Sequence, residues 1–136
     1  MSITLLIRDE SATGESYQEL PIEFETERIT VRDLIRERVR QEVSSFNQKQ
    51  GDLHFRGLVQ PTDTERVLNG RRTEYRLKAP RSIDWEEQFS RAIEAFGRSG
   101  FFLLVGEKQV ESLDQELLIE PDTRVSFVKL VPLVGG

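Results

Sequence analysis

Apolar and polar residues alternate in two stretches near the start of the chain. The alternation runs over residues 3–8 and returns over residues 20–25, with the period of two that is typical of half-buried β-strands. A polar stretch from Ser11 to Ser16, which contains Gly14, lies between them. The first 27 residues are therefore predicted to form a β-hairpin.

A helical period follows the hairpin. Thr30 is a favourable N-cap residue with Asp33 three residues later, and the apolar residues after it recur at the spacing of one helix face. That face comprises Val31, Leu34, Ile35, Val39, Val43 and Phe46. The opposite face is predicted to meet water, and it comprises Arg32, Arg36, Glu37, Arg40 and Gln41.

A second helix is predicted after Asp84, which suits the N-cap position, with Glu87 where a capping box needs an acidic side chain. Gly97 or Gly100 is expected to end this helix. Its apolar residues are expected in the core, and they are Trp85, Phe89, Ala92, Ile93 and Phe96.

Residues 49–83, between the two predicted helices, carry weaker patterns. Pro61 and Pro80 break regular structure, while Asn69-Gly70 is a good hairpin-turn signal. We expect this segment to form an excursion outside the main sheet and outside its core.

Two further strands are predicted later in the chain, from Phe101 to Val105 and from Val125 to about Val131. The order of strands and helices predicts a single α+β domain over residues 1–136, a mixed sheet wrapped around the first helix. The first and last strands then lie side by side at the sheet centre. The apolar residues between the last two strands are expected to close one end of the core, and they are Leu113, Leu117, Leu118 and Ile119.

Composition narrows the class of protein. Hydrophobic residues make up 37% of the 136 residues and charged residues 32%, which suits a globular core. The longest apolar run, residues 101–105, is far shorter than the roughly 20 residues of a membrane span. Arg8, Asp9 and Glu10 interrupt the N-terminal apolar stretch before it reaches the length of a signal peptide. We therefore expect a cytoplasmic protein that does not bind a membrane.

Several chemistries lack the side chains that they need. The chain has no cysteine and one histidine, His54, so disulfides, thiol catalysis and thiolate metal sites are excluded, and one histidine cannot make a zinc site by itself. The acidic pair Glu86-Glu87 lies on a predicted helix without a histidine or apolar cleft beside it, and we assign it no acid–base role. We expect no metal, no cofactor and no enzymatic activity.

Charge is distributed unevenly. The net charge is −5, but residues 51–83 carry 7 basic and 4 acidic side chains, an excess of +3. This segment is either a docking surface for an acidic partner or a solvated loop face. Phe55 and Tyr75 are its only aromatic residues, too few for the basic and aromatic pattern of a nucleic-acid site, so no nucleic-acid partner is expected.

The last third of the chain resembles a known family. The stretch 102–110, an apolar strand followed by Gly106-Glu107-Lys108-Gln109, resembles the third strand, tight turn and short fourth strand of ubiquitin. Residues 117–127 are similar to the helical turn and final strand that follow there. The ending Pro132-Leu133-Val134-Gly135-Gly136 is similar to the tail of the small sulfur carriers of molybdopterin and thiamine synthesis, and residues 30–34 to the start of their first helix.

The resemblance covers about residues 2–46 and 84–136 and implies the β-grasp fold, with an insertion at about 49–83 and a flexible tail at about 132–136. Ubiquitin has arginines just before its glycines, where this chain has Pro132 and Val134. The resemblance therefore implies a bacterial-type ubiquitin-like modifier related to the sulfur carriers.

The resemblance also implies where the chemistry lies. An activating enzyme would adenylate the carboxylate of Gly136, and Gly135 and Gly136 would let the narrow tail reach its site because neither has a Cβ atom. Recognition of the tail would fall to Pro132, Leu133 and Val134. A conjugating enzyme, a peptidase and a protein target are the further partners implied for a modifier.

Three functions stay open at this stage. They are a modifier joined to a target through Gly136, a sulfur carrier with a thiocarboxylate on Gly136, and a non-covalent adaptor. A Gly-Gly ending also occurs as a frayed terminus or a boundary without function. By likeness to the exposed sheet face of ubiquitin, Leu104 with Val128 or Leu130 is a candidate partner patch, and the alternative is that these residues belong to the core.

Overall fold

The computed structural model describes residues 2–11, 16–49, 51–70 and 72–129. The elements in chain order are β1 (Ile3–Ser11), β2 (Ser16–Phe24), β3 (Arg28–Thr30), α1 (Val31–Gln48), β4 (Thr64–Asn69), β5 (Arg72–Leu77), α2 (Trp85–Gly97), β6 (Phe101–Val105), β7 (Lys108–Val110), β8 (Glu116–Leu118) and β9 (Val125–Lys129).

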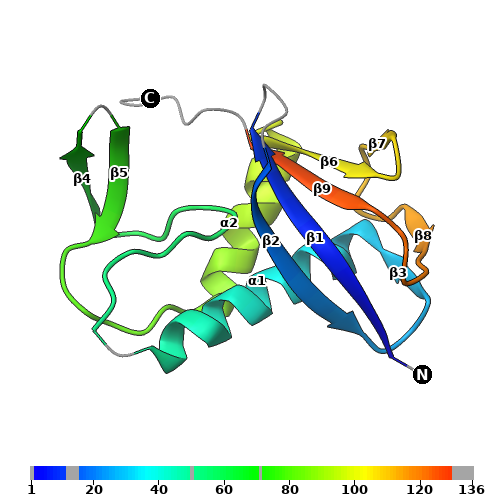
Figure 1. Cartoon of the computed structure of the whole chain (residues 1–136), viewed down its shortest axis with the longest axis horizontal. Coiled ribbons are helices and arrows are strands. Elements are labelled where there is room, and N and C mark those ends of the chain that lie inside the picture. Colours follow the sequence, from blue (N-terminus) through cyan, green and yellow to red (C-terminus); the bar gives the residue numbers. More distant parts are fainter. Residues whose placement is uncertain (1, 12–15, 50, 71, 130–136) are drawn as a thin grey trace.

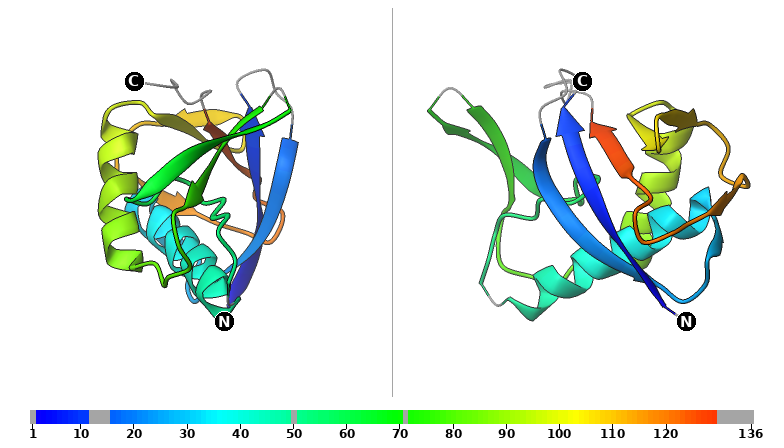
Figure 2. Two further views of the ribbon diagram at one scale, coloured as in Figure 1. Left: turned by 90° about the vertical axis from the view of Figure 1, so that its left-hand side faces the viewer. Right: turned by 45° about the vertical axis from the view of Figure 1, so that its right-hand side comes forward.

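A five-stranded sheet with the order β2-β1-β9-β6-β7 forms the body of the protein (Figure 1). β1 runs parallel to β9, while β1 with β2, β9 with β6 and β6 with β7 are antiparallel. Both helices lie on the same side of this sheet, as Figure 2 shows. The predicted α+β class, the N-terminal hairpin and the adjacent first and last strands are confirmed.

The core lies between the sheet and the helices. Along the strands every second residue is buried, as the predicted alternation requires, with Leu5 and Ile7 on β1 and Val125 and Phe127 on β9. These side chains join one cluster with the apolar face of α1. Burying a large aliphatic or aromatic side chain stabilises the fold by about 1.5–3 kcal/mol, so the shared cluster is the main source of stability.

The start of α1 is fixed by a reciprocal capping box. The Thr30 Oγ1 atom accepts a hydrogen bond from the Asp33 amide at 3.1 Å, and Asp33 Oδ2 accepts one from the Thr30 amide at 3.0 Å. Two amides without helical partners are thereby satisfied. The predicted helix start and its buried face are confirmed, except that Arg38 is also buried and that Arg36, Glu37 and Gln41 are half-buried.

α2 begins and ends where its sequence predicted, and Asp84 Oδ1 accepts a hydrogen bond from the Glu86 amide at 3.0 Å. Glu87 does not complete a capping box, because its carboxylate accepts a hydrogen bond from the Thr62 hydroxyl at 3.3 Å. The apolar residues of the helix pack on the core, and the polar Gln88 is buried among them.

The segment between the helices departs from the prediction in one respect. β4 and β5 form the expected hairpin around Asn69-Gly70 and, within the part of the chain that the structure describes, pair only with each other (Figure 1). However, the segment also contributes Phe55, Leu58, Leu77 and Ile83 to the core cluster. The expectation that residues 49–83 stay outside the core is therefore wrong.

Specific contacts explain why this segment is drawn into the core. The Phe55 ring packs edge-on against the Phe46 ring, with 5.2 Å between centroids and 85° between planes. Asn47 at the end of α1 exchanges two hydrogen bonds of 2.9 Å with the backbone of Ile83. In the sequence, Phe55 and Ile83 are apolar residues of this segment, but they do not recur at the spacing of a helix or a strand, so no pattern marked them as core residues.

The link between β6 and β9 closes one end of the core as expected, with one exception. Leu117 and Ile119 are buried, but Leu118 is 60% exposed. β8 pairs with β3, and its side chains point alternately toward the core and toward solvent. Two neighbouring residues of the strand therefore cannot both point inward.

Candidate functional site

The candidate site is the region where β9 ends at Lys129. Leu130, Pro132, Leu133, Val134, Gly135 and Gly136 lie outside the described residues. β9 is held on both sides, by β1 with Lys129 opposite Ser11 and by β6 with Lys129 opposite Phe101. Lys129 therefore lies in the middle of the sheet, between β1 and β6.

A buried ion cluster lies beneath this point. Asp9 on β1 and Arg38 on α1 face each other, with Arg38 Nη2 donating to Asp9 Oδ2 at 2.6 Å and Arg38 Nη1 donating to Asp9 Oδ1. Arg38 Nε donates to Glu42 Oε2 at 3.3 Å. Arg38 is 0% exposed and Asp9 1% exposed. A buried charge without a partner is strongly destabilising, so these groups depend on one another.

Lys129 adds a second cation to the cluster. Its Nζ atom lies 3.6 Å from Asp9 Oδ2 and donates to the backbone carbonyl of Gly57 at 2.7 Å. We call Asp9, Arg38, Glu42 and Lys129 the root cluster. Its two cations and two carboxylates balance, and it joins β1, α1 and β9.

The root cluster also holds the segment that precedes β4. Glu42 Oε1 accepts a hydrogen bond from the Leu58 amide at 3.0 Å, next to the Gly57 carbonyl that Lys129 binds. A Cβ atom at Gly57 would collide with the Phe55 ring and lie 2.9 Å from Glu42 Oε1. Glycine is therefore required here for close approach.

Burial shifts the protonation of three members of the cluster. Burial raises the pKa of Glu42. The charge of Arg38 opposes this shift but does not outweigh it, and Arg38 also binds Asp9. Burial and then the charge of Arg38 lower the pKa of Lys129. For Arg38, burial opposes the charge, but Glu42 and Asp9 outweigh it and raise the pKa. The Arg38 guanidinium also lies 4.6 Å from the centroid of the Phe127 ring, a cation–π contact.

The candidate partner patch lies on the other side of the sheet. Leu104 and Val128 are half-buried and alternate with Leu103 and Phe127, which face the helices and the core. Phe102 lies opposite Val128 in the ladder and Leu104 opposite Ser126. The structure thus places Leu104 and Val128 on the face away from the core, together with Phe102 and the half-exposed Leu6, which the sequence analysis had not selected.

Two findings bear on other functions. Among the described ranges, no three histidine or carboxylate side chains lie close enough to hold a metal ion. In the same part of the chain, neither helix is both long and apolar enough to cross a membrane.

The sequence contained a signal for the root cluster that its reading missed. Asp9 continues the inward-facing series of Leu5 and Ile7, and Arg38 lies four residues after Leu34 on the apolar face of α1. Each is a charged residue at a core position, and such residues need a partner. The partner could not be identified without the register of β1 against α1.

Comparison of the chain with protein-family models, with curated proteins and with solved structures finds no match.

Proposed function

We propose that this chain is a ubiquitin-like protein modifier of the β-grasp class, adenylated at the Gly136 carboxylate by an activating enzyme and then joined to a protein target. The observation that carries the proposal is β9. It lies parallel to β1 at the centre of the sheet, across from α1, and the Gly135-Gly136 ending follows it in the sequence.

The chemistry belongs to the tail and to a partner enzyme. The Gly136 carboxylate attacks the α-phosphate of ATP, the bond to pyrophosphate breaks, and an acyl-adenylate forms. An amine or hydroxyl of the target later attacks the Gly136 carbonyl carbon, the bond to the phosphate breaks, and AMP leaves with the proton of the nucleophile released to solvent. Gly135 and Gly136 carry no Cβ atoms, so the chain can pass between close protein walls. Pro132 has a fixed φ, which reduces the entropy lost when the tail is bound.

The remaining partners follow from this chemistry. A conjugating enzyme would transfer the activated tail, and a peptidase would release it. The expected location is the cytoplasm, where ATP is available. Leu104 and Val128, with Leu130 beyond them in the sequence, form the proposed partner patch.

The test uses two variants, one with Gly136 deleted and one extended by a single residue. Each moves the carboxylate by about 3.5 Å, and an attack that depends on alignment tolerates much less. ATP–pyrophosphate exchange with an adenylating enzyme that is active on the parent chain should disappear in both variants. Intact mass of the native protein establishes whether the mature chain ends at Gly136.

Thermal unfolding of both variants provides the control. Glycine has no side chain to pack, so the melting temperature should stay within about 1 °C of the parent value. Full exchange activity from the Gly136-deleted protein would overturn the assignment of this terminus as the reactive group.

A sulfur carrier is the second candidate, because the Pro132-Leu133-Val134-Gly135-Gly136 ending is similar to sulfur-carrier tails. In that case Gly136 carries a thiocarboxylate, and intact mass shows one oxygen replaced by sulfur. A conjugate would instead yield a target peptide bearing the tail. An unmodified Gly136 in growing cells would favour a non-covalent adaptor.

A further inference from the structure

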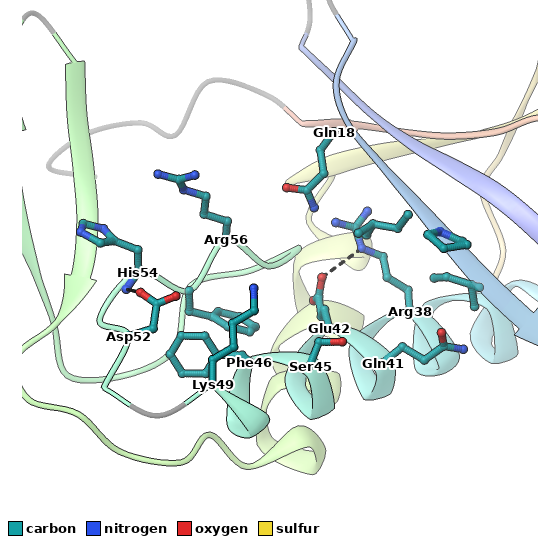
Figure 3. A pocket seen from close by; sticks show the side chains of 14 residues that line it. Gln18, Arg38, Gln41, Glu42, Ser45, Phe46, Lys49, Asp52, His54 and Arg56 are labelled. Carbon is teal, nitrogen blue, oxygen red and sulfur yellow. Dashed lines mark hydrogen bonds and ion pairs between the residues drawn. The ribbon is translucent and has the colours of Figure 1, made fainter.

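A cavity of about 550 Å³ opens beside the main sheet, and Arg38 and Glu42 of the root cluster are among the residues that line it (Figure 3). β2, the edge strand, forms one wall with residues 20–22, and the second half of α1 forms another. Residues 52–56 of the inserted segment complete it. We call this cavity the side pocket. Its volume lies in the range that binds small molecules.

The base of the side pocket is apolar. The perpendicular rings of Phe46 and Phe55 meet there, with 5.2 Å between their centroids, and Leu20 and Ile22 of β2 also line the pocket. Edges of two fixed rings offer a flat or aliphatic group a preformed contact surface.

The buried charges at the side of the pocket do not determine the charge of a ligand. Both terminal nitrogens of Arg38 bind Asp9, and its Nε atom binds Glu42. The second oxygen of Glu42 is occupied by the Leu58 amide. These groups therefore satisfy one another within the protein.

The rim of the pocket carries charges that are not satisfied in this way. Lys49 and Arg56 are exposed, and within the described residues neither side chain forms a hydrogen bond or an ion pair. Asp52 is the acidic residue of the rim, and one of its oxygens accepts a hydrogen bond from the His54 amide at 2.9 Å. Two cations against one carboxylate leave the rim with a single positive charge.

Uncommitted hydrogen-bonding groups lie beside these cations. Gln18, Gln41 and Ser45 line the pocket, and their side chains form no hydrogen bond within the described ranges. Figure 3 shows Gln18, Lys49 and Arg56 around the same opening. Amide and hydroxyl donors next to a cation suit an anionic oxygen acceptor.

We propose that the side pocket binds a small organic monocarboxylate with an aromatic or aliphatic body. The body rests on Phe46 and Phe55, and the carboxylate lies between Lys49 and Arg56. One negative charge matches the single net positive charge of the rim, whereas a phosphate monoester would bring an excess. This binding is independent of activation at Gly136.

The experiment compares four probes that share a phenyl body and differ in charge: phenylacetate, 2-phenylethanol, phenethylamine and phenyl phosphate. Each is titrated into the ¹⁵N-labelled full chain, and amide shifts are followed by NMR. Phenylacetate should give saturable shifts at residues 18–22, 45–49 and 52–56. 2-Phenylethanol should bind about tenfold more weakly, and phenethylamine more weakly still.

The variant Lys49→Gln/Arg56→Gln should weaken phenylacetate binding by about tenfold, because both charge-assisted contacts are lost. Lys108→Gln/Arg124→Gln removes the same charge at exposed positions outside the pocket and should change affinity less than about twofold. The comparison of probes on the parent protein does not depend on how the variants fold.

Three results would overturn the proposal. They are no saturable shift with phenylacetate at roughly 20 mM, equal binding of phenylacetate and 2-phenylethanol, and equal loss of affinity in both double variants. Tighter binding of phenyl phosphate than of phenylacetate would overturn the assignment to a monocarboxylate.

Discussion

Arg38 joins parts of the chain that are distant in sequence. It binds Asp9 on the first strand and Glu42 one helical turn further on, and it lies over the Phe127 ring of the last strand. The bidentate pair with Asp9 satisfies both partners in the interior, where either alone would be costly.

Replacement of Arg38 by methionine is expected to lower the free energy of unfolding by about 3–5 kcal/mol, because Glu42 would stay buried without its paired cation and Asp9 would be left with Lys129, at 3.6 Å. Urea unfolding measures the loss. Arg98→Met makes the same chemical change at a side chain that is 72% exposed and paired with Glu94, and should cost less than about 1 kcal/mol. Equal losses in the two variants would contradict this account of the cluster.

Glu42 gives the root cluster a pH dependence with a definite sign. Burial raises the folded-state pKa of Glu42, so the folded state holds the proton more tightly than the unfolded chain does. The contribution of this group to stability is therefore fully present below its ordinary pKa of 4.5 and is lost as the pH rises through the raised pKa. We therefore expect wild type to lose stability relative to Glu42→Gln as the pH is raised above 4.5. Urea unfolding of both proteins from pH 4.5 to pH 8 tests this, and a difference that grows in favour of wild type would refute it.

At the scale of elements, local signals were reliable where a period or a cap was present. Thr30 and Asp84 start the two helices, alternation places β1 and β2, and β6 is a continuous apolar run. The inserted segment was placed less well, because Phe55 and Leu58 lie in irregular chain whose packing depends on residues far away in sequence. Core membership there is a tertiary property that no local period reports.

The inserted segment packs closely against the core at Gly57, where an added Cβ atom would meet Phe55 and Glu42. We expect Gly57→Ala to lower the free energy of unfolding by about 1–3 kcal/mol, because the new methyl group would displace the Phe55 ring or Glu42. Gly97→Ala is the matched control, since nothing lies within 4 Å of its added Cβ atom. It ends a helix, so its effect should be neutral or slightly stabilising. Thermal unfolding compares the two, and a harmless Gly57→Ala would contradict the packing.

For the whole molecule, the order of strands and helices predicted a mixed sheet with its first and last strands side by side, while the ion pairs beneath it had no counterpart in that prediction. The adjacency of β1 and β9 followed from the order of elements, whereas their parallel direction and the partners of Arg38 and Lys129 needed the three-dimensional structure. The tail residues from Leu130 to Gly136 lie outside the described part of the chain, so their role stays a prediction.

The β4–β5 hairpin is expected to be dispensable for the body of the protein. Thr64 and Leu77 are ladder partners, about 5 Å apart, so a short glycine-containing turn can replace residues 65–76. The free energy of unfolding should change by less than about 1 kcal/mol. Leu77→Ala in the parent chain should cost about 2–5 kcal/mol, because this residue is 0% exposed. A chain that fails to fold without the hairpin would show that β4 and β5 support the core.

The position of β9 also determines when the protein can fold during its synthesis. The ribosome makes β1 and β6 well before residues 125–129, yet these late residues fill the gap between the two strands. Until they emerge, the centre of the sheet has two open edges, which are prone to pair with other chains. A nascent chain that stalls before residue 125 therefore cannot complete the main sheet. The sheet is completed only when the segment that leads to Gly136 has been made.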